Sequence, residues 1–223
     1  MGKRTALFVN HKTKQLAEFM LDFFFQRMEC PACRCEAGGL CSVCQAEIRP
    51  WGEFIFEGIQ GHAMVHYSTA AKKLIYNFKK GLSYDAMVSL FAIMDDHLGD
   101  IKWDEYDCIV PVTSIKTNLK ARGFDPAVLL ARHLAKSTGL PLVNCIKNKG
   151  TQAHKSMNHS QRMASSKTSF EVRRGWAGKI KGQRILLFDD VMTSGATILA
   201  VAQLLKSHGA KQVEFLVVER STA

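Results

Sequence analysis

Two neighbouring acidic residues, Asp189 and Asp190, follow the apolar run 185–188 and precede a short turn. An apolar strand would bring both carboxylates to the C-terminal edge of an open α/β sheet, where such sheets bind ligands. The turn leads into a helix expected over 195–208, whose free N–H groups and dipole favour a phosphate group. Gly195 would let the backbone approach that phosphate closely. Hydroxyl donors are supplied by Thr193, Ser194 and Thr197.

Paired carboxylates beside a phosphate pocket would repel a bare polyanion. They suit a ligand whose ribose hydroxyls donate to them and whose charge is offset by Mg²⁺. Charge-assisted hydrogen bonds of about 1.5–3 kcal/mol each would outweigh a helix-dipole contribution of about 0.3–2 kcal/mol. The alternative is an ordinary strand–turn–helix with an acidic cap. The G-x-x-x-x-G-K-[ST] and G-x-G-x-x-G motifs are absent, and Ser194 lacks the G-x-S-x-G frame of a hydrolase.

Five of the seven cysteines lie between residues 30 and 44, in the pattern C-x2-C-x7-C-x2-C. Two CxxC turns can present four thiolates to one Zn²⁺ ion in a closed structural site. A pair of disulfides is the alternative, but an odd cysteine count and a reducing compartment disfavour it. Cys35 could replace Cys33 as a ligand. The expected zinc ligands are Cys30, Cys33, Cys41 and Cys44.

Charge and hydropathy narrow the class of protein. The net charge is +10, and residues 141–223 hold 13 basic and 5 acidic residues. A positive field of this kind attracts phosphate-rich ligands, either nucleic acid or a polyphosphorylated metabolite. Because no apolar run approaches 18 residues and the N-terminal apolar run is too short for a signal peptide, we expect no membrane span and a cytoplasmic location.

The elements that must position these residues alternate between strands and helices, which predicts a parallel α/β sheet. An amphipathic helix around residues 16–24 would pack on the body of the protein, with membrane-surface or partner binding as alternatives. Strands are expected at 62–67, 107–112, 140–146, 184–188 and 212–218. Helices are expected from Ser68 or Thr69 to Gly81, over 83–98, from Asp125 and Pro126 to Gly139, and over 195–208, before Gly209.

The strand–acid–acid–turn–helix motif resembles the 5-phosphoribosyl-1-pyrophosphate (PRPP) binding motif of type I phosphoribosyltransferases. With the cysteine module in front, roughly residues 21–220 resemble the ComF family of competence-associated proteins. Weaker matches, persuasive in their order, are Leu74–Lys79, Pro111-Val112, Arg122–Pro126, Thr151, Arg162 and Phe170.

This resemblance implies a type I phosphoribosyltransferase-like parallel sheet flanked by helices, with a small N-terminal zinc module built on four cysteines. Expected domains are a helical segment (1–29), the zinc module (30–58) and the phosphoribosyltransferase-like domain (59–223). Asp189 and Asp190 would be the catalytic residues that bind the ribose 2′- and 3′-hydroxyls. The implied 5′-phosphate site is Thr193, Ser194, Gly195, Ala196 and Thr197. The implied pyrophosphate site is Thr113 and Ser114, with Lys79, Lys116 and Arg122 as cationic partners.

The resemblance also implies Mg²⁺ as the ion bound with PRPP and a role in handling single-stranded DNA during natural transformation. Three positions depart from relatives: His154 replaces a glutamine, Ser165 replaces an asparagine, and Thr193 replaces an aspartate of purine enzymes. Purine salvage is therefore not implied, and the acceptor stays open. The alternative function is a non-catalytic module that binds single-stranded DNA or a competence helicase through residues 147–184.

Overall fold

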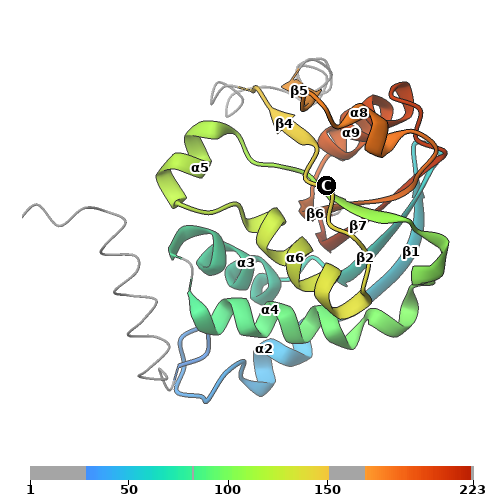
Figure 1. The fold of residues 1–223 in the computed structure, drawn as a ribbon. Helices are drawn as coiled ribbons and strands as arrows, with labels where there is room; N and C mark the ends of the chain where they lie inside the picture. The colour runs from blue at the N-terminus through green and yellow to red at the C-terminus, as the bar shows by residue number, and fades with distance from the viewer. Residues whose placement is uncertain (1–28, 82, 151–168, 222–223) are drawn as a thin grey trace, which may run out of the picture.

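A computed structural model of the chain describes residues 29–81, 83–150 and 169–221 (Figure 1). No helix in this part of the chain is long and apolar enough to cross a membrane. The amphipathic helix expected around residues 16–24 lies outside the described residues. So do four positions of the basic loop, Thr151, His154, Arg162 and Ser165.

The centre of the molecule is a five-stranded sheet in the order β1-β2-β7-β6-β3. Four strands are parallel, which confirms the expected α/β sheet, and β1 pairs antiparallel with β2. The sequence did not indicate β1, because Pro50 and Gly52 are typical of loops; a proline is tolerated as the first residue of an edge strand. The strands are β1 (Pro50–Phe56), β2 (Ile59–His66), β3 (Cys108–Pro111), β6 (Arg184–Met192) and β7 (Gln212–Arg220).

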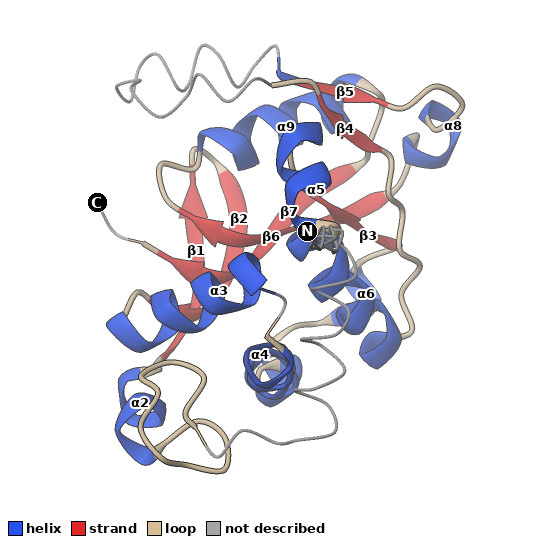
Figure 2. Ribbon diagram, turned by 90° about the vertical axis from the view of Figure 1, so that its left-hand side faces the viewer, coloured by secondary structure: helices blue, strands red, loops and turns tan. Residues whose placement is uncertain are grey.

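Helices cover both faces of the sheet (Figure 2). Leu186 and Phe188 of β6 are buried against α3, α4 and α6, whereas Ile185 and Leu187 are buried against α9 and α8. A central strand covered on both sides is expected to be continuously apolar, as β6 is up to Asp189. The helices are α3 (Thr69–Gly81), α4 (Tyr84–Asp96), α6 (Pro126–Thr138), α8 (Ala177–Ile180) and α9 (Ala196–Ser207).

The predicted helix boundaries are confirmed where the sequence carries cap residues. The hydroxyl of Ser68 accepts a hydrogen bond from the Ala71 amide (3.0 Å) at the start of α3. Gly139 ends α6 in the left-handed conformation, with φ of 76°. Four short helices complete the described helices: α2 (Ser42–Glu47), η1 (Leu98–Asp100), η2 (Trp103–Glu105) and α5 (Lys116–Arg122).

The strand expected over 140–146 is wrong in its position. One bridge joins Leu142 to Ile109 of β3, and the chain then leaves the main sheet. It forms a separate antiparallel ribbon from β4 (Ile146–Asn148) and β5 (Phe170–Val172). Pro111 of β3 has no N–H to donate, so the parallel pairing with Ile109 cannot continue beyond Val143.

Candidate functional site

The acid pair lies within β6, close to its C-terminal end. Asp190 is 7% exposed and its amide donates a hydrogen bond to Asp189 Oδ1 (2.9 Å). Burial, and next the charge of Asp190, raise the pKa of Asp189 well above its usual value. The pair therefore favours a cation or hydroxyl donors that would relieve the crowding of negative charge.

Lys79 reaches the acid pair from α3. Its Nζ donates to Asp190 Oδ1 at 2.6 Å, and both side chains are largely withdrawn from solvent. The resemblance implies Lys79 as a partner of pyrophosphate, which stays a prediction; in the structure Lys79 contacts the carboxylate of Asp190. An ion pair shielded from water in this way holds Asp190 in one orientation.

The loop after β3 runs beside the acid pair, since the Val112 amide donates to the Phe188 carbonyl (2.8 Å). The Thr113 hydroxyl donates to the Ile146 carbonyl (3.0 Å), and the Thr113 carbonyl accepts from the Asn148 side chain (3.1 Å). These two bonds attach the β4–β5 ribbon to the loop. Asn148 is therefore a structural residue of the site that sequence reasoning missed.

Ser114, in the same loop, is bound to Asp125. The Ser114 amide and hydroxyl donate to the two carboxylate oxygens of Asp125 at 2.8 and 3.2 Å. Asp125 precedes α6 as expected, but its side chain makes no cap hydrogen bond to the helix. Burial raises the pKa of Asp125, and the charge of Asp190 adds to the effect. Asp125 thus belongs to the electrostatic surroundings of the acid pair.

The proposed phosphate turn joins β6 to α9. Thr193 is exposed and Ser194 and Thr197 are half-buried, whereas Ala196 is buried at the first turn of α9. Lys116 is exposed and Arg122 half-buried on α5, a helix packed against α3 (Figure 1).

Gly195, the N-cap of α9, is required by two features of the structure. Its φ is 69°, a left-handed conformation that side chains with a Cβ adopt with strain. A Cβ placed there would lie 2.3 Å from the Phe56 ring and 2.7 Å from Met192 Cε. Phe56 of β1 therefore packs directly on the turn, whereas the close approach of the Gly195 backbone to a phosphate stays a prediction.

We expect Gly195→Ala to lower the free energy of unfolding by about 2–4 kcal/mol, from left-handed strain and overlap with Phe56. Urea denaturation would measure the loss. Gly139→Ala is the matched control, because Gly139 has a φ of 76° but open space around its Cα. Equal losses in the two variants would contradict the packing argument.

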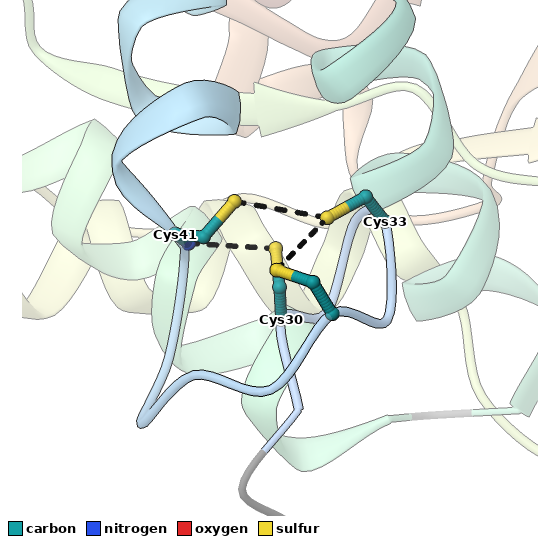
Figure 3. Close-up of side chains that lie close together, drawn as sticks. Cys30, Cys33 and Cys41 are labelled. Atoms are coloured by element: carbon teal, nitrogen blue, oxygen red, sulfur yellow. Dashed lines mark hydrogen bonds between the residues drawn. The ribbon is translucent and has the colours of Figure 1, made fainter.

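The cysteine module gathers its sulfurs as a metal site requires. The Sγ atoms of Cys30, Cys33, Cys35 and Cys41 all lie within 4.8 Å of one another. Tetrahedral Zn–S bonds of about 2.3 Å place sulfurs about 3.8 Å apart. The spacings of Cys33 to Cys35 (3.4 Å) and to Cys41 (3.7 Å) agree with this value. Figure 3 shows Cys30, Cys33 and Cys41 converging. This donor set fits a structural metal ion such as zinc.

The four sulfurs that lie closest together include Cys35 and not Cys44, so Cys44 as the fourth ligand stays a prediction. Cys35 joins Cys33 rather than replacing it, because Arg34 has a φ of 64° and turns the chain between them. Cys44, the predicted fourth ligand, is buried beside the group, and its amide donates to Cys41 Sγ (3.5 Å). Its side chain also interacts with the thiol of Cys30. Five sulfurs thus surround the candidate site.

The thiol of Cys30 ionises more readily than an ordinary cysteine thiol. Burial opposes ionisation of Cys30, but hydrogen bonds from the Cys33, Cys41 and Ala32 amides lower its pKa to about 6. A thiol that ionises this readily is suited to metal ligation.

The cysteine module is attached to the sheet domain along α3. Glu47 of α2 accepts a hydrogen bond from the Ala70 amide (3.1 Å), near the start of the helix. Two turns later the Asn77 side chain donates to the Pro31 carbonyl (2.7 Å). Since Lys79 lies on the same helix, α3 connects the candidate metal site to the acid pair.

Sequence comparison identifies proteins that are similar to this chain. Residues 119–221 match the family model of the phosphoribosyl transferase domain, a range that includes β6, the turn and α9. The chain is 27% identical to Competence protein ComFC of Streptococcus pneumoniae, over 86% of this chain and 82% of that protein. It is 24% identical to Competence protein F of Haemophilus influenzae, over 87% of this chain and 97% of that protein.

A shorter match is to Adenine phosphoribosyltransferase of Treponema denticola, 33% identical over 44% of this chain. The matched segment spans 47% of that enzyme, about half of its length. Among solved structures, adenine phosphoribosyltransferase from Thermoanaerobacter pseudethanolicus aligns with 80% of this chain and 98% of its own. The sequence identity is 15% and the TM-score 0.39.

Proposed function

We propose, from the premise that this chain is a ComF-type, phosphoribosyltransferase-like protein, that it binds PRPP together with Mg²⁺. One observation carries the proposal: two adjacent carboxylates, half-buried Asp189 and buried Asp190, lie near the C-terminal end of β6, a few residues before the start of α9. Asp189 and Asp190 would accept hydrogen bonds from the ribose diol. The backbone and hydroxyl groups of residues 193–197 would hold the 5′-phosphate.

The charge of the acid pair supports a cation in the complex. Mg²⁺ prefers carboxylate, phosphate and water oxygens, and Asp189 and Asp190 offer such oxygens. Burial and the charge of Asp190 raise the pKa of Asp189, and a bound cation would oppose both effects. The bound ion would neutralise negative charge that grows on pyrophosphate as it leaves C1′. We propose phosphoribosyl transfer as the reaction class for this site.

The cysteine module has a structural role in this proposal, with Zn²⁺ as its ion. A site made only of thiolates has no open position for a substrate. The names of two relatives refer to competence, and we propose that the protein acts in the uptake of single-stranded DNA.

A thermal-shift series tests the proposal. PRPP with Mg²⁺ at 100 times its Kd should add about 2.7 kcal/mol of stability and raise Tm by about 5–10 °C. Ribose 5-phosphate and pyrophosphate, each with Mg²⁺, should have smaller effects, because each lacks part of the ligand. A shift as large with pyrophosphate alone would overturn recognition of the ribose.

A second candidate function is a non-catalytic module for single-stranded DNA or a helicase partner. The observation that favours it is the basic β4–β5 and α8 region, where Lys179 Nζ lies 4.6 Å from the Trp176 ring centre. Lys147 and Lys149 count less, because both are paired with Glu171.

The second candidate predicts DNA binding that weakens steeply with salt. Neutralising Arg173 and Arg174 together should abolish that binding, and Asp190→Asn should leave it intact. DNA binding that is insensitive to salt would reject this candidate.

A further inference from the structure

Glu219 of β7 is a buried acid that the proposed site does not use. It is 2% exposed and lies in register between Val65 of β2 and Val191 of β6. Within the described chain, its Oε2 atom is buried and has no hydrogen-bond partner. A buried carboxylate oxygen left unpaired is unfavourable, so this atom calls for a partner in some state of the protein.

The charges of three groups affect the pKa of Glu219, and each group either lies on α3 or belongs to the acid pair. They are Lys79 and Lys72 of α3 and Asp190 of β6. Burial, the largest effect, and the charge of Asp190 raise the pKa of Glu219 to about 7, against the lowering effect of the two lysines. The neighbours on β2 and β6, Val65 and Val191, carry no charge.

Binding of a ligand to Asp190 would deprive Lys79 of its partner. In the free protein its ammonium group is held by Asp190 at 2.6 Å. A diol or cation that engages Asp190 competes for the same carboxylate, and a shielded ammonium left without a partner is strongly disfavoured. Resting on the proposed function, we propose that Glu219 is a positioning residue that accepts Lys79 when Asp190 turns to the bound ligand.

The movement of Lys79 from Asp190 to Glu219 makes the affinity for the ligand depend on pH. Ionised Glu219 attracts Lys79 more strongly than neutral Glu219, so the arrival of Lys79 lowers the Glu219 pKa and releases a proton. The free protein holds that proton below about pH 7. Affinity for PRPP with Mg²⁺ should therefore rise as pH increases from 6 and level off above 7, by about five- to tenfold.

Calorimetric titration of the full chain with PRPP and Mg²⁺ at pH 6 and 8 tests the role. Glu219→Gln keeps the shape but cannot ionise, so its affinity should change with pH several-fold less than that of the wild type. Glu214→Gln, on the same strand at its other end, is the matched control and should keep the wild-type profile. Titration of PRPP itself is common to all three proteins.

A wild-type profile in Glu219→Gln would overturn the role of Glu219 while leaving the proposed function intact. Absence of PRPP binding in every protein would overturn both. Should Glu219→Gln fail to fold, carboxyl NMR of ¹³C-glutamate-labelled wild type serves instead. A glutamate that titrates near pH 7 should move lower once PRPP and Mg²⁺ are added; an unmoved titration rejects the proposal.

Discussion

We expect Asp190→Asn to raise the Kd for PRPP with Mg²⁺ about 10- to 100-fold, measured by isothermal titration calorimetry. The substitution keeps the size of the side chain but removes a charged acceptor, and charge-assisted hydrogen bonds are worth about 1.5–3 kcal/mol. It also removes one negative charge from the site proposed for Mg²⁺, which weakens the attraction for the ion. Both effects weaken binding of PRPP with Mg²⁺.

Asp95→Asn provides the control for this prediction. Asp95 is also paired with a basic side chain, His133 at 2.8 Å, but it lies on α4 away from the acid pair. Loss of the Asp95 charge should leave the Kd for PRPP with Mg²⁺ within about a factor of two of the wild-type value, as expected for a surface pair. An unchanged Kd in Asp190→Asn, with native stability, would reject the acid pair as the ribose site.

The second large effect concerns the metal. We expect Cys30→Ser to lower bound zinc from about one ion per chain to a trace and to reduce the free energy of unfolding by at least about 3 kcal/mol. The reason is that the cysteine module contains a single described helix of six residues and cannot build a core of its own. Elemental analysis and urea denaturation would measure the two losses.

Cys145→Ala is the matched control, because Cys145 is a buried cysteine of the sheet core outside the module. It should retain the metal. Serine substitutions of Cys35 and Cys44, made one at a time, would then identify the fourth thiolate. Full zinc content in Cys30→Ser would contradict the assignment of the site.

Local signals in the sequence were sufficient for the elements that carry the candidate site. Four consecutive apolar residues predicted β6, and Ser68 and Gly139 marked the ends of helices, because strand burial and helix capping depend on neighbours in the chain. The parallel character of the sheet also follows from alternating strands and helices. The edge strand β1 was missed because its proline and glycine are typical of turns.

Contacts between distant segments could not be derived in the same way. Lys79 and Asp190 are 111 positions apart, and only the packing of α3 on the sheet brings them together. Glu219 lies just beyond the strand expected over 212–218, yet it is buried and within the electrostatic reach of both. Cys35 is included by the left-handed turn at Arg34, a conformation that no cysteine spacing indicates.

The number of residues between Asn77 and Lys79 in α3 is constrained, because Asn77 contacts the cysteine module and Lys79 contacts the acid pair. A single inserted residue would rotate everything beyond it by about 100° around the helix axis. Asn77 could then still reach Pro31, but Lys79 would face away from Asp190. Insertions and deletions should therefore be excluded from this stretch in any functional homologue, whereas substitutions on the outward face of α3, as at exposed Tyr76, should be tolerated.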